Sequence, residues 1–279
     1  MSHAPSTNQE TDAGAAFNAH EAWLRGYFSV ERFDVKNSKR TSVRRKNIDY
    51  LRLKDLALHL LDIKPGMRVL DVGCANGPMM VYCGLQGAIV SGVDLDPGAV
   101  AVANDFLRRY KVQGEAVVGD AMKLDFPDNT FDALISGDFV EHITDDVKVA
   151  MFKEALRVLK PGARVVIKTP NLAYLKASLR FKQLRAVMRF ENPFDLIIPH
   201  TPGTEDPQHI GLVDRWGLRD SMLAAGFLNY QFVYAPLRRF GTNKVVEVLS
   251  TEIPLVRDVL CEDLFVVAHK PIVVSHFPD

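Results

Sequence analysis

The chain has 279 residues and an apolar content of 47%, enough to bury the core of one large domain. Its 34 basic residues balance its 34 acidic ones, so the whole chain lacks the basic footprint of a nucleic-acid-binding protein. The three cysteines, Cys74, Cys83 and Cys261, are widely spread, which argues against a disulfide framework and against a cysteine metal cluster. We interpret them as reduced thiols of a cytoplasmic protein.

Residues 1–20 are rich in small and polar side chains and lack the basic start and apolar stretch of a secretory signal. We expect them to form a disordered tail and residues 21–279 to form a single domain. No apolar run reaches the roughly 18 to 20 residues needed to span a bilayer, so no transmembrane segment is expected.

Strand-like and helix-like segments alternate along most of the chain. The expected strands are residues 68–72, 88–93, 116–118, 131–136, 164–168, 229–234 and 264–268, and the expected helices are 54–61, 77–86, 98–110, 146–159 and 215–225. The fourth of these helices should stop at Lys160-Pro161-Gly162. The alternation predicts an α/β fold, a Rossmann-like doubly wound sheet of about seven strands, mostly parallel, with helices on both faces.

Two insertions interrupt this alternation. Residues 172–212 follow the fifth strand and contain a predicted helix at 175–190 and a proline-rich irregular stretch at 192–207. Residues 236–260 form the second, with helical character from 244 and a break near Pro254. Ligands of open α/β sheets bind beyond the carboxyl ends of the strands, where the first insertion emerges. We therefore expect these insertions to form a lid and a substrate wall.

The most informative segment is D-V-G-C-A-N-G at residues 71–77, where an apolar strand enters a glycine-bearing turn before a helix. Such a turn offers backbone N–H groups to a polar cofactor. Asp94 ends the next strand and can accept hydrogen bonds from ribose hydroxyls. An acid there also fits a nicotinamide dinucleotide site, but Ala75 and Pro78 stand where that fingerprint needs glycine.

Five ordered motifs resemble those of the class I S-adenosylmethionine-dependent methyltransferases. They are D-V-G-C-A-N-G, G-V-D-L-D-P, G-D-A-M-K-L-D-F, F-D-A-L-I-S-G-D-F-V-E-H-I and L-K-P-G-A-R-V-V-I-K-T-P-N, within residues 64–171. The resemblance implies S-adenosyl-L-methionine as cofactor and a small-molecule methyltransferase, typical of biosynthesis. Any one motif is weakly specific, whereas five in this order are strongly so.

The resemblance also implies which residues hold the cofactor. Gly73, Gly77 and Asp71 would border its methionine part, Asp94 its ribose and Leu95 its adenine; Asp120, Ala121 and Met122 would meet the adenine amine, and Ser136 would offer its carbonyl to the ammonium group. Cys74 and Ala75 occupy positions where many relatives have glycine. We expect them to adopt an ordinary backbone conformation.

Two histidines are the catalytic candidates. His142 follows the fourth strand, and His209 lies where the lid rejoins the core. Either could act as a general base, and either could be structural, His142 beside the cofactor and His209 as a hinge residue; His200 is a weaker candidate. Glu141, Asp145 and Asp146 could bind a hard cation such as Mg²⁺, but as acids near a helix start they fit a structural role better, and we expect no metal.

Basic residues leave further alternatives open. Those of the lid helix and those after the sixth strand could bind an anionic substrate, or lie on the solvated face of an amphipathic helix. They are Arg180, Lys182, Arg185, Arg189, Arg238 and Arg239. The basic run from Lys36 to Lys46 is either a solvated segment or one that folds over the cofactor.

The leading hypothesis is methyl transfer to an oxygen or nitrogen of a small molecule such as a secondary metabolite, a sugar or a lipid-like acceptor. Two alternatives stay open, a nicotinamide-dependent oxidoreductase and a non-catalytic protein that keeps the cofactor. A homodimer is compatible with the sequence, and no nucleic-acid partner is expected.

Overall fold

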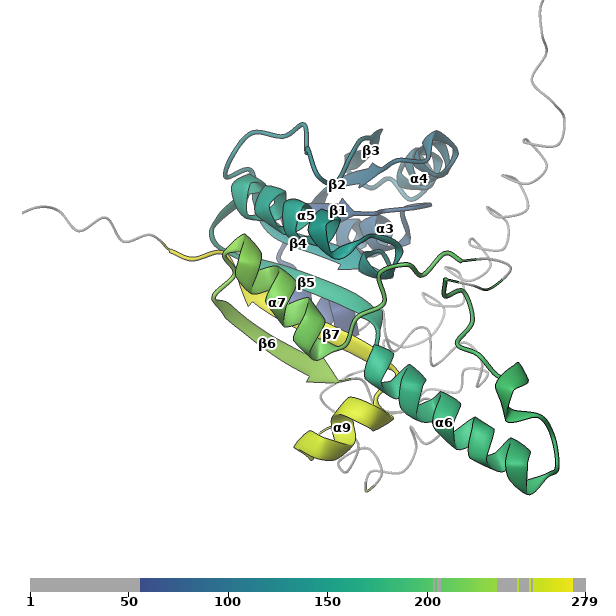
Figure 1. The fold of residues 1–279 in the computed structure, drawn as a ribbon. Helices are drawn as coiled ribbons and strands as arrows, with labels where there is room; N and C mark the ends of the chain where they lie inside the picture. Colours follow the sequence, from purple (N-terminus) through teal and green to yellow (C-terminus); the bar gives the residue numbers. More distant parts are fainter. Residues whose placement is uncertain are drawn as a thin grey trace, which may run out of the picture.

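The computed structural model describes residues 56–202, 204, 207–234, 245, 251 and 253–272. Within them, seven strands form one sheet in the order β3-β2-β1-β4-β5-β7-β6 (Figure 1). The strands are β1 Arg68–Val72, β2 Ile89–Asp94, β3 Gly114–Val118, β4 Phe131–Gly137, β5 Leu159–Pro170, β6 Asn229–Tyr234 and β7 Asp263–His269. The first five pair in parallel, and β7 runs antiparallel to both β5 and β6. The predicted mostly parallel sheet is confirmed.

Helices cover both faces of this sheet. The helices are α3 Pro78–Leu85, α4 Pro97–Arg109, α5 Asp145–Val158, α6 Leu172–Met188, α7 Arg215–Ala225 and α9 Pro254–Leu260, with short 3-10 turns η1 Val140–His142 and η2 Pro193–Asp195. Buried side chains of α3 and α4 share one apolar cluster with β1 and β2, and those of α5 and α7 share a second cluster on the other face. Residues 56–61, from an expected helix, are helical as well and pack in the first cluster. The doubly wound arrangement follows from strands that are apolar on both sides.

The fifth strand is longer than the sequence predicts. Helix α5 ends at Val158, one residue before the predicted end, and β5 begins at once with Leu159 paired to Phe131. The Pro161-Gly162 step then shifts the register before regular pairing with β4 resumes at Arg164. The predicted stop signal, Lys160-Pro161-Gly162, therefore lies inside β5. Gly162 adopts a φ of 77°, which interrupts the regular pairing with β4 without ending the strand.

Helix α6 leaves the carboxyl edge of the sheet and projects away from it, beside α9 (Figure 1). It begins three residues earlier than predicted because Asn171 caps it: the Ala173 N–H donates to Asn171 Oδ1 (3.1 Å). The side-chain amide of Asn171 also donates to the carbonyls of Asp258 and Cys261, both at 2.9 Å. These bonds join the start of the first insertion to the end of the second.

Helix α6 is not the ordinary amphipathic helix that its basic and apolar residues suggested. Phe181, Leu184 and Met188 are 59%, 60% and 73% exposed, and Ala186 is its buried residue. A helix that projects from the sheet has little core to cover, which explains the exposure.

Several expectations fall on residues outside the described ranges. They concern the tail 1–20, the basic run 36–46, Arg238, Arg239 and most of the helix expected from residue 244; α9 is its described end. Among the helices that the structure does describe, none combines the length and apolar character needed to cross a membrane.

Candidate functional site

Two glycines shape the turn between β1 and α3, and both need a left-handed backbone. Gly73 has a φ of 72°, and a Cβ there would lie 2.4 Å from the ring of Phe139. Gly77, the residue before α3, has a φ of 75°, and its Cβ would lie 2.8 Å from the Cβ of Ala103. The backbone of this turn therefore approaches its neighbours as closely as a residue without a side chain allows.

Between these glycines, Ala75 corrects one expectation. Its φ of 44° is left-handed, whereas Cys74 keeps a negative φ as expected. The Ala75 N–H donates to Oδ2 of Asp94 (2.8 Å), and Oδ1 of the same carboxylate accepts from the Asp96 N–H (3.0 Å). The acid at the end of β2 therefore holds the turn after β1 in place, which offsets the strain at Ala75.

Exposed apolar side chains surround the ends of β2 and β3. Leu95 is 69% exposed, and Val118 and Met122 are also exposed. Asp120 closes the turn beside them, because its Oδ1 accepts from the Met122 N–H (2.8 Å), and Ala121 is buried beneath. An apolar surface edged by carboxylates has the character of a nucleobase and ribose site.

The two remaining cofactor candidates lie on the central strands. Asp71 of β1 pairs in register with Gly92 of β2 and with Ile135 of β4, and Ser136 comes next on β4. Both side chains are buried, and the Ser136 hydroxyl has no hydrogen-bond partner within the described part of the chain. The structure thus brings all nine expected cofactor residues to the carboxyl edge of β1, β2, β3 and β4.

The two catalytic candidates meet each other. The rings of His142 on η1 and His209 in the segment 207–211 have centroids 5.0 Å apart, and the ring centroid of His200 lies 5.5 Å from that of His209. Nδ1 of His142 lies 3.0 Å from the backbone carbonyl of Gln208. A carbonyl can only accept, so Nδ1 carries the proton and Nε2 keeps its lone pair in the neutral ring.

Backbone contacts, called here the Gly211 clamp, fix the segment 207–211 against η1. The Gly211 N–H donates to the carbonyl of Glu141 (2.8 Å), and a Cβ at Gly211 would lie 1.8 Å from the carbonyl oxygen of Ile143. Nearby, the His209 N–H donates to the carbonyl of His200 (2.7 Å), which closes the loop between them. His209 is therefore held near His142 by bonds on both sides of it in sequence.

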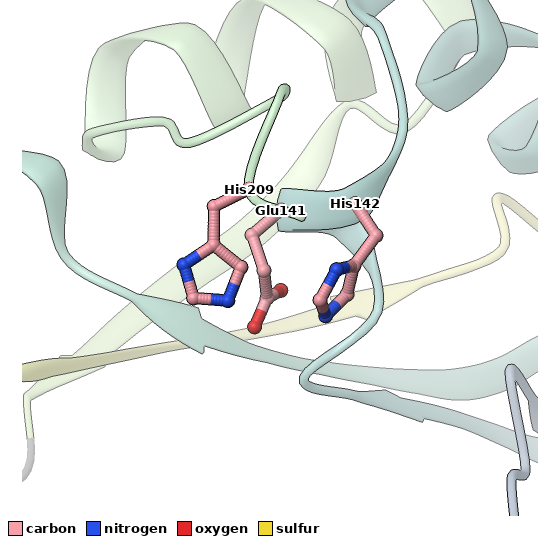
Figure 2. A group of neighbouring side chains, drawn as sticks. All are labelled: Glu141, His142 and His209. Carbon is pink, nitrogen blue, oxygen red and sulfur yellow. The ribbon is translucent and has the colours of Figure 1, made fainter. Parts of the chain in front are cut away.

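Glu141 lies with the histidines and is 1% exposed. Figure 2 shows its carboxylate between the two imidazole rings. Burial, and secondly the negative charge of Asp138, raise the pKa of Glu141 to about 7. Its Oε2 accepts from the Thr169 hydroxyl (3.0 Å). The sequence grouped Glu141 with Asp145 and Asp146, but Asp145 pairs with Lys148 (2.7 Å) and Asp146 accepts from Thr144 at the start of α5.

These side chains line a cavity of about 350 Å³. Its lining is Asp138, Glu141, His142, Lys168, Pro170, Leu175, Ile198, Pro199, His200, His209, Glu262 and Asp263. Lys168 forms ion pairs with Asp138 and Asp263, and these two carboxylates outweigh burial and raise the pKa of its ammonium group. The lining thus carries four carboxylates and one lysine. The basic residues of α6, which were candidates for binding an anionic substrate, do not belong to it.

Sequence reasoning missed Lys168, Thr169 and Gly211, and it favoured a structural role for Glu141 over cation binding. Gly211 could have been noticed because it is a glycine two residues after His209, and glycine is typical of positions where two backbones approach closely. No local signal exists for Lys168, whose partners Asp138 and Asp263 are distant in sequence. The cavity adjoins the glycine turn through Phe139. The ring of Phe139 lies against Gly73, and His142 of the cavity lining follows three residues later in the chain.

Residues 70–167 match the family model described as a methyltransferase domain. The chain is similar to phosphoethanolamine N-methyltransferase 3 of Arabidopsis thaliana, with 39% identity over 109 residues, 39% of this chain and 22% of that protein. It is also similar to 27-O-demethylrifamycin SV methyltransferase of Amycolatopsis mediterranei, with 33% identity over 119 residues, 42% of this chain and 43% of that protein. The chain therefore spans less than half the length of these curated relatives.

A solved structure shares the fold over a longer stretch. It is described as a SAM-dependent methyltransferase from Methanosarcina mazei, with a TM-score of 0.55, 20% identity, and coverage of 77% of this chain and 97% of that one. At this identity the likeness concerns the fold, which by itself does not fix a function.

Proposed function

Residues 70–167 belong to the methyltransferase domain family, and from this premise we propose that the chain transfers a methyl group from S-adenosylmethionine to an oxygen or nitrogen of a small-molecule acceptor. The observation that carries the proposal is the glycine turn after β1 bonded through Ala75 to Asp94. In this arrangement the polar turn lies beside the carboxylate that we propose to bind the ribose of the cofactor.

The residues present fit this cofactor. The ribose hydroxyls can donate to the second lone pairs of the Asp94 oxygens. Leu95, Val118 and Met122 offer an apolar face to adenine. The carboxylate of Asp71 and the hydroxyl of Ser136, which has no hydrogen-bond partner among the described residues, lie where the methionine end would be. These groups match a nucleoside joined to a charged amino acid.

A nicotinamide dinucleotide fits less well. Pro78 occupies the first position of α3 and has no N–H to offer to a diphosphate. Ala75 stands in the turn where the dinucleotide fingerprint has its second glycine. The turn therefore favours a cofactor without a diphosphate.

Methyl transfer depends mainly on the alignment of the acceptor atom with the methyl group of the cofactor. The cofactor supplies a methyl group already activated by its positive sulfur, and correct positioning contributes roughly 7 to 11 kcal/mol to lowering such a barrier. The cavity next to the turn positions the acceptor and keeps water away, and Nε2 of His142 is placed to take a proton from an acceptor hydroxyl. A general base of this kind is worth about 10² to 10⁴ in rate.

The lining of the cavity bears on the acceptor. Four carboxylates against one ion-paired lysine disfavour an anionic acceptor and favour a neutral or cationic one. The names of the two relatives describe transfer to nitrogen and to oxygen, and both chemistries suit a site next to histidines.

Calorimetry with S-adenosylmethionine, its demethylated product and NADH tests the cofactor. We expect binding of the first two and none of NADH; binding of NADH alone would support the oxidoreductase instead. Incubation with methyl-labelled cofactor and metabolite extracts, followed by mass spectrometry, then tests transfer. A protein that binds the cofactor and labels no acceptor in any extract would favour a non-catalytic binding protein.

A further inference from the structure

The geometry points to a divalent transition-metal site formed by Glu141, His142 and His209 in the cavity beside the glycine turn. We propose that this site takes Zn²⁺ or an ion of similar preference and holds an oxygen of the acceptor. The site stands on its own geometry, and its role in transfer rests on the proposed function. The proposal refines that function, because it makes Nε2 of His142 a metal ligand instead of a proton acceptor.

The three donor atoms are close enough for one ion. One ring nitrogen of each histidine and one Glu141 oxygen all lie within 4.8 Å of one another (Figure 2). An ion placed midway between the three atoms would therefore lie at most about 2.8 Å from each of them. A bond from zinc to nitrogen or oxygen is about 2.0 to 2.1 Å long, so each donor atom must move by at most about 0.7 Å. Small rotations of the side chains close that gap without a change in the backbone.

The surroundings orient the ligands as a metal site requires. His142 donates from Nδ1 to the Gln208 carbonyl, which leaves Nε2 available for the ion. Glu141 accepts from Thr169, so its carboxylate is also held from outside. Metal-binding histidines and carboxylates commonly have such second hydrogen bonds, which fix ring tautomer and direction.

Charge favours a cation at this point. Glu141 is buried, and the structure gives this carboxylate no ion pair within the described residues. Asp138, Glu262 and Asp263 add negative charge around the same cavity, while Lys168 is already engaged by two of them. A buried carboxylate beside two imidazole rings is stabilised by a divalent ion.

The donor set also selects the ion. Two imidazoles and one carboxylate suit zinc and other first-row transition metals, whereas Mg²⁺ and Ca²⁺ prefer oxygen ligands alone. Three protein ligands leave a coordination position open toward the cavity. An acceptor hydroxyl bound there would release its proton to water more readily, since the ion lowers the pKa of a bound oxygen.

The site is tested by titrating the chelator-treated full chain with Zn²⁺ and measuring the heat of binding by calorimetry. We expect one Zn²⁺ per chain, and at least a tenfold loss of affinity in His142→Gln, His209→Gln and Glu141→Gln. His59→Gln, at an exposed histidine of the helical segment 56–61, is the matched control and should bind like the parent. Co²⁺ should give the visible absorption of a bound ion in the parent and the control, and lose it in the three variants.

Circular dichroism of each metal-free variant separates ligand loss from misfolding. If Glu141→Gln fails to fold, the two histidine variants, whose side chains are only half-buried, still decide the matter. Absence of zinc binding in the parent, or unchanged affinity in both folded histidine variants, would overturn the proposal. Cofactor calorimetry is measured separately, so a chain that binds zinc without binding S-adenosylmethionine contradicts the proposed function and leaves the metal site standing.

Discussion

At the scale of single residues, the site depends on backbone positions that only small side chains can occupy. Gly73 has a left-handed φ, and the ring of Phe139 leaves no room for a side chain there. Ala75 also has a left-handed φ, and the hydrogen bond from its N–H to Asp94 stabilises this strained conformation. The glycine turn thus links two strands of the sheet to the cavity. Small changes here are expected to have large effects.

Gly73→Ala should destabilise the fold by about 3 kcal/mol, because it adds left-handed strain and an overlap with Phe139. Chemical denaturation measures the loss. Gly137→Ala, at the end of β4, is the control, since its φ is not in the left-handed region and nothing lies within 4 Å of the added Cβ. Equal stability of the two variants would contradict the described turn.

Asp94→Ala should weaken cofactor binding about 10- to 100-fold, through the lost charged hydrogen bonds and a loosened turn. Asp96→Ala is the matched control two residues away. Its carboxylate caps α4 by accepting from the Gly98 N–H (2.8 Å), so this variant should lose about 1 kcal/mol of stability and keep its cofactor affinity. Calorimetry on both variants distinguishes these effects, and equal affinity losses would refute the role of Asp94.

At the scale of elements, helix α5 supports the turns that follow β3. Arg157 donates to the carbonyls of Leu124 and Phe126, both at 2.7 Å, and to Glu154, whose Oε2 accepts from the Leu124 N–H (2.8 Å). This network fixes the chain just after Asp120. The hydrogen bond from Arg157 outweighs burial and lowers the pKa of Glu154 below its usual 4.5.

Because this pKa is lower in the folded state, Glu154 stabilises the fold above pH 4.5 and loses that effect as the pH falls through its folded pKa. Glu154→Gln should therefore cost about 1 kcal/mol at neutral pH, and the difference from the parent should shrink between about pH 5 and pH 3. Urea denaturation across this range measures it. Glu115→Gln, at an exposed carboxylate of β3, should follow the parent throughout; a pH-independent deficit in Glu154→Gln would argue against the ionised pair.

At the scale of the whole molecule, the three cysteines are buried at separate places in the fold and form no disulfide with one another. Burial raises the pKa of Cys261 to about 12 and raises that of Cys74 as well. The thiols of Cys74 and Cys261 are thus far from the reactive thiolate form. Burial also shields all three side chains from reagents in solution.

A thiol reagent such as dithionitrobenzoate at pH 8 should react slowly with all three cysteines of the folded chain and rapidly once it is unfolded, when ordinary thiol pKa values of about 8.5 return. Absorbance follows both phases. Rapid reaction of a thiol under native conditions would contradict the described packing. Cofactor binding should slow any reaction of Cys74 further, since it lies in the glycine turn.

The sequence by itself determined the order of the elements and the cofactor turn. Its apolar runs are local, and β1, α7 and β6 match their predicted bounds residue for residue. The glycine turn and Asp94 are also local signals, because a strand end and a sharp turn can be read from consecutive residues. That is why all nine residues predicted to bind the cofactor lie at one edge of the sheet.

Only the tertiary structure decided the cavity. Glu141, His142 and His209 come together because the Gly211 clamp holds the segment 207–211 on η1, a contact between segments about seventy residues apart. Sequence patterns reflect local propensity and burial, so they could not distinguish Glu141 from Asp145 and Asp146, nor reveal that the apolar side of α6 would be exposed. Contacts distant in the chain depend on the packing of the whole sheet, and the proposed metal site is one of them.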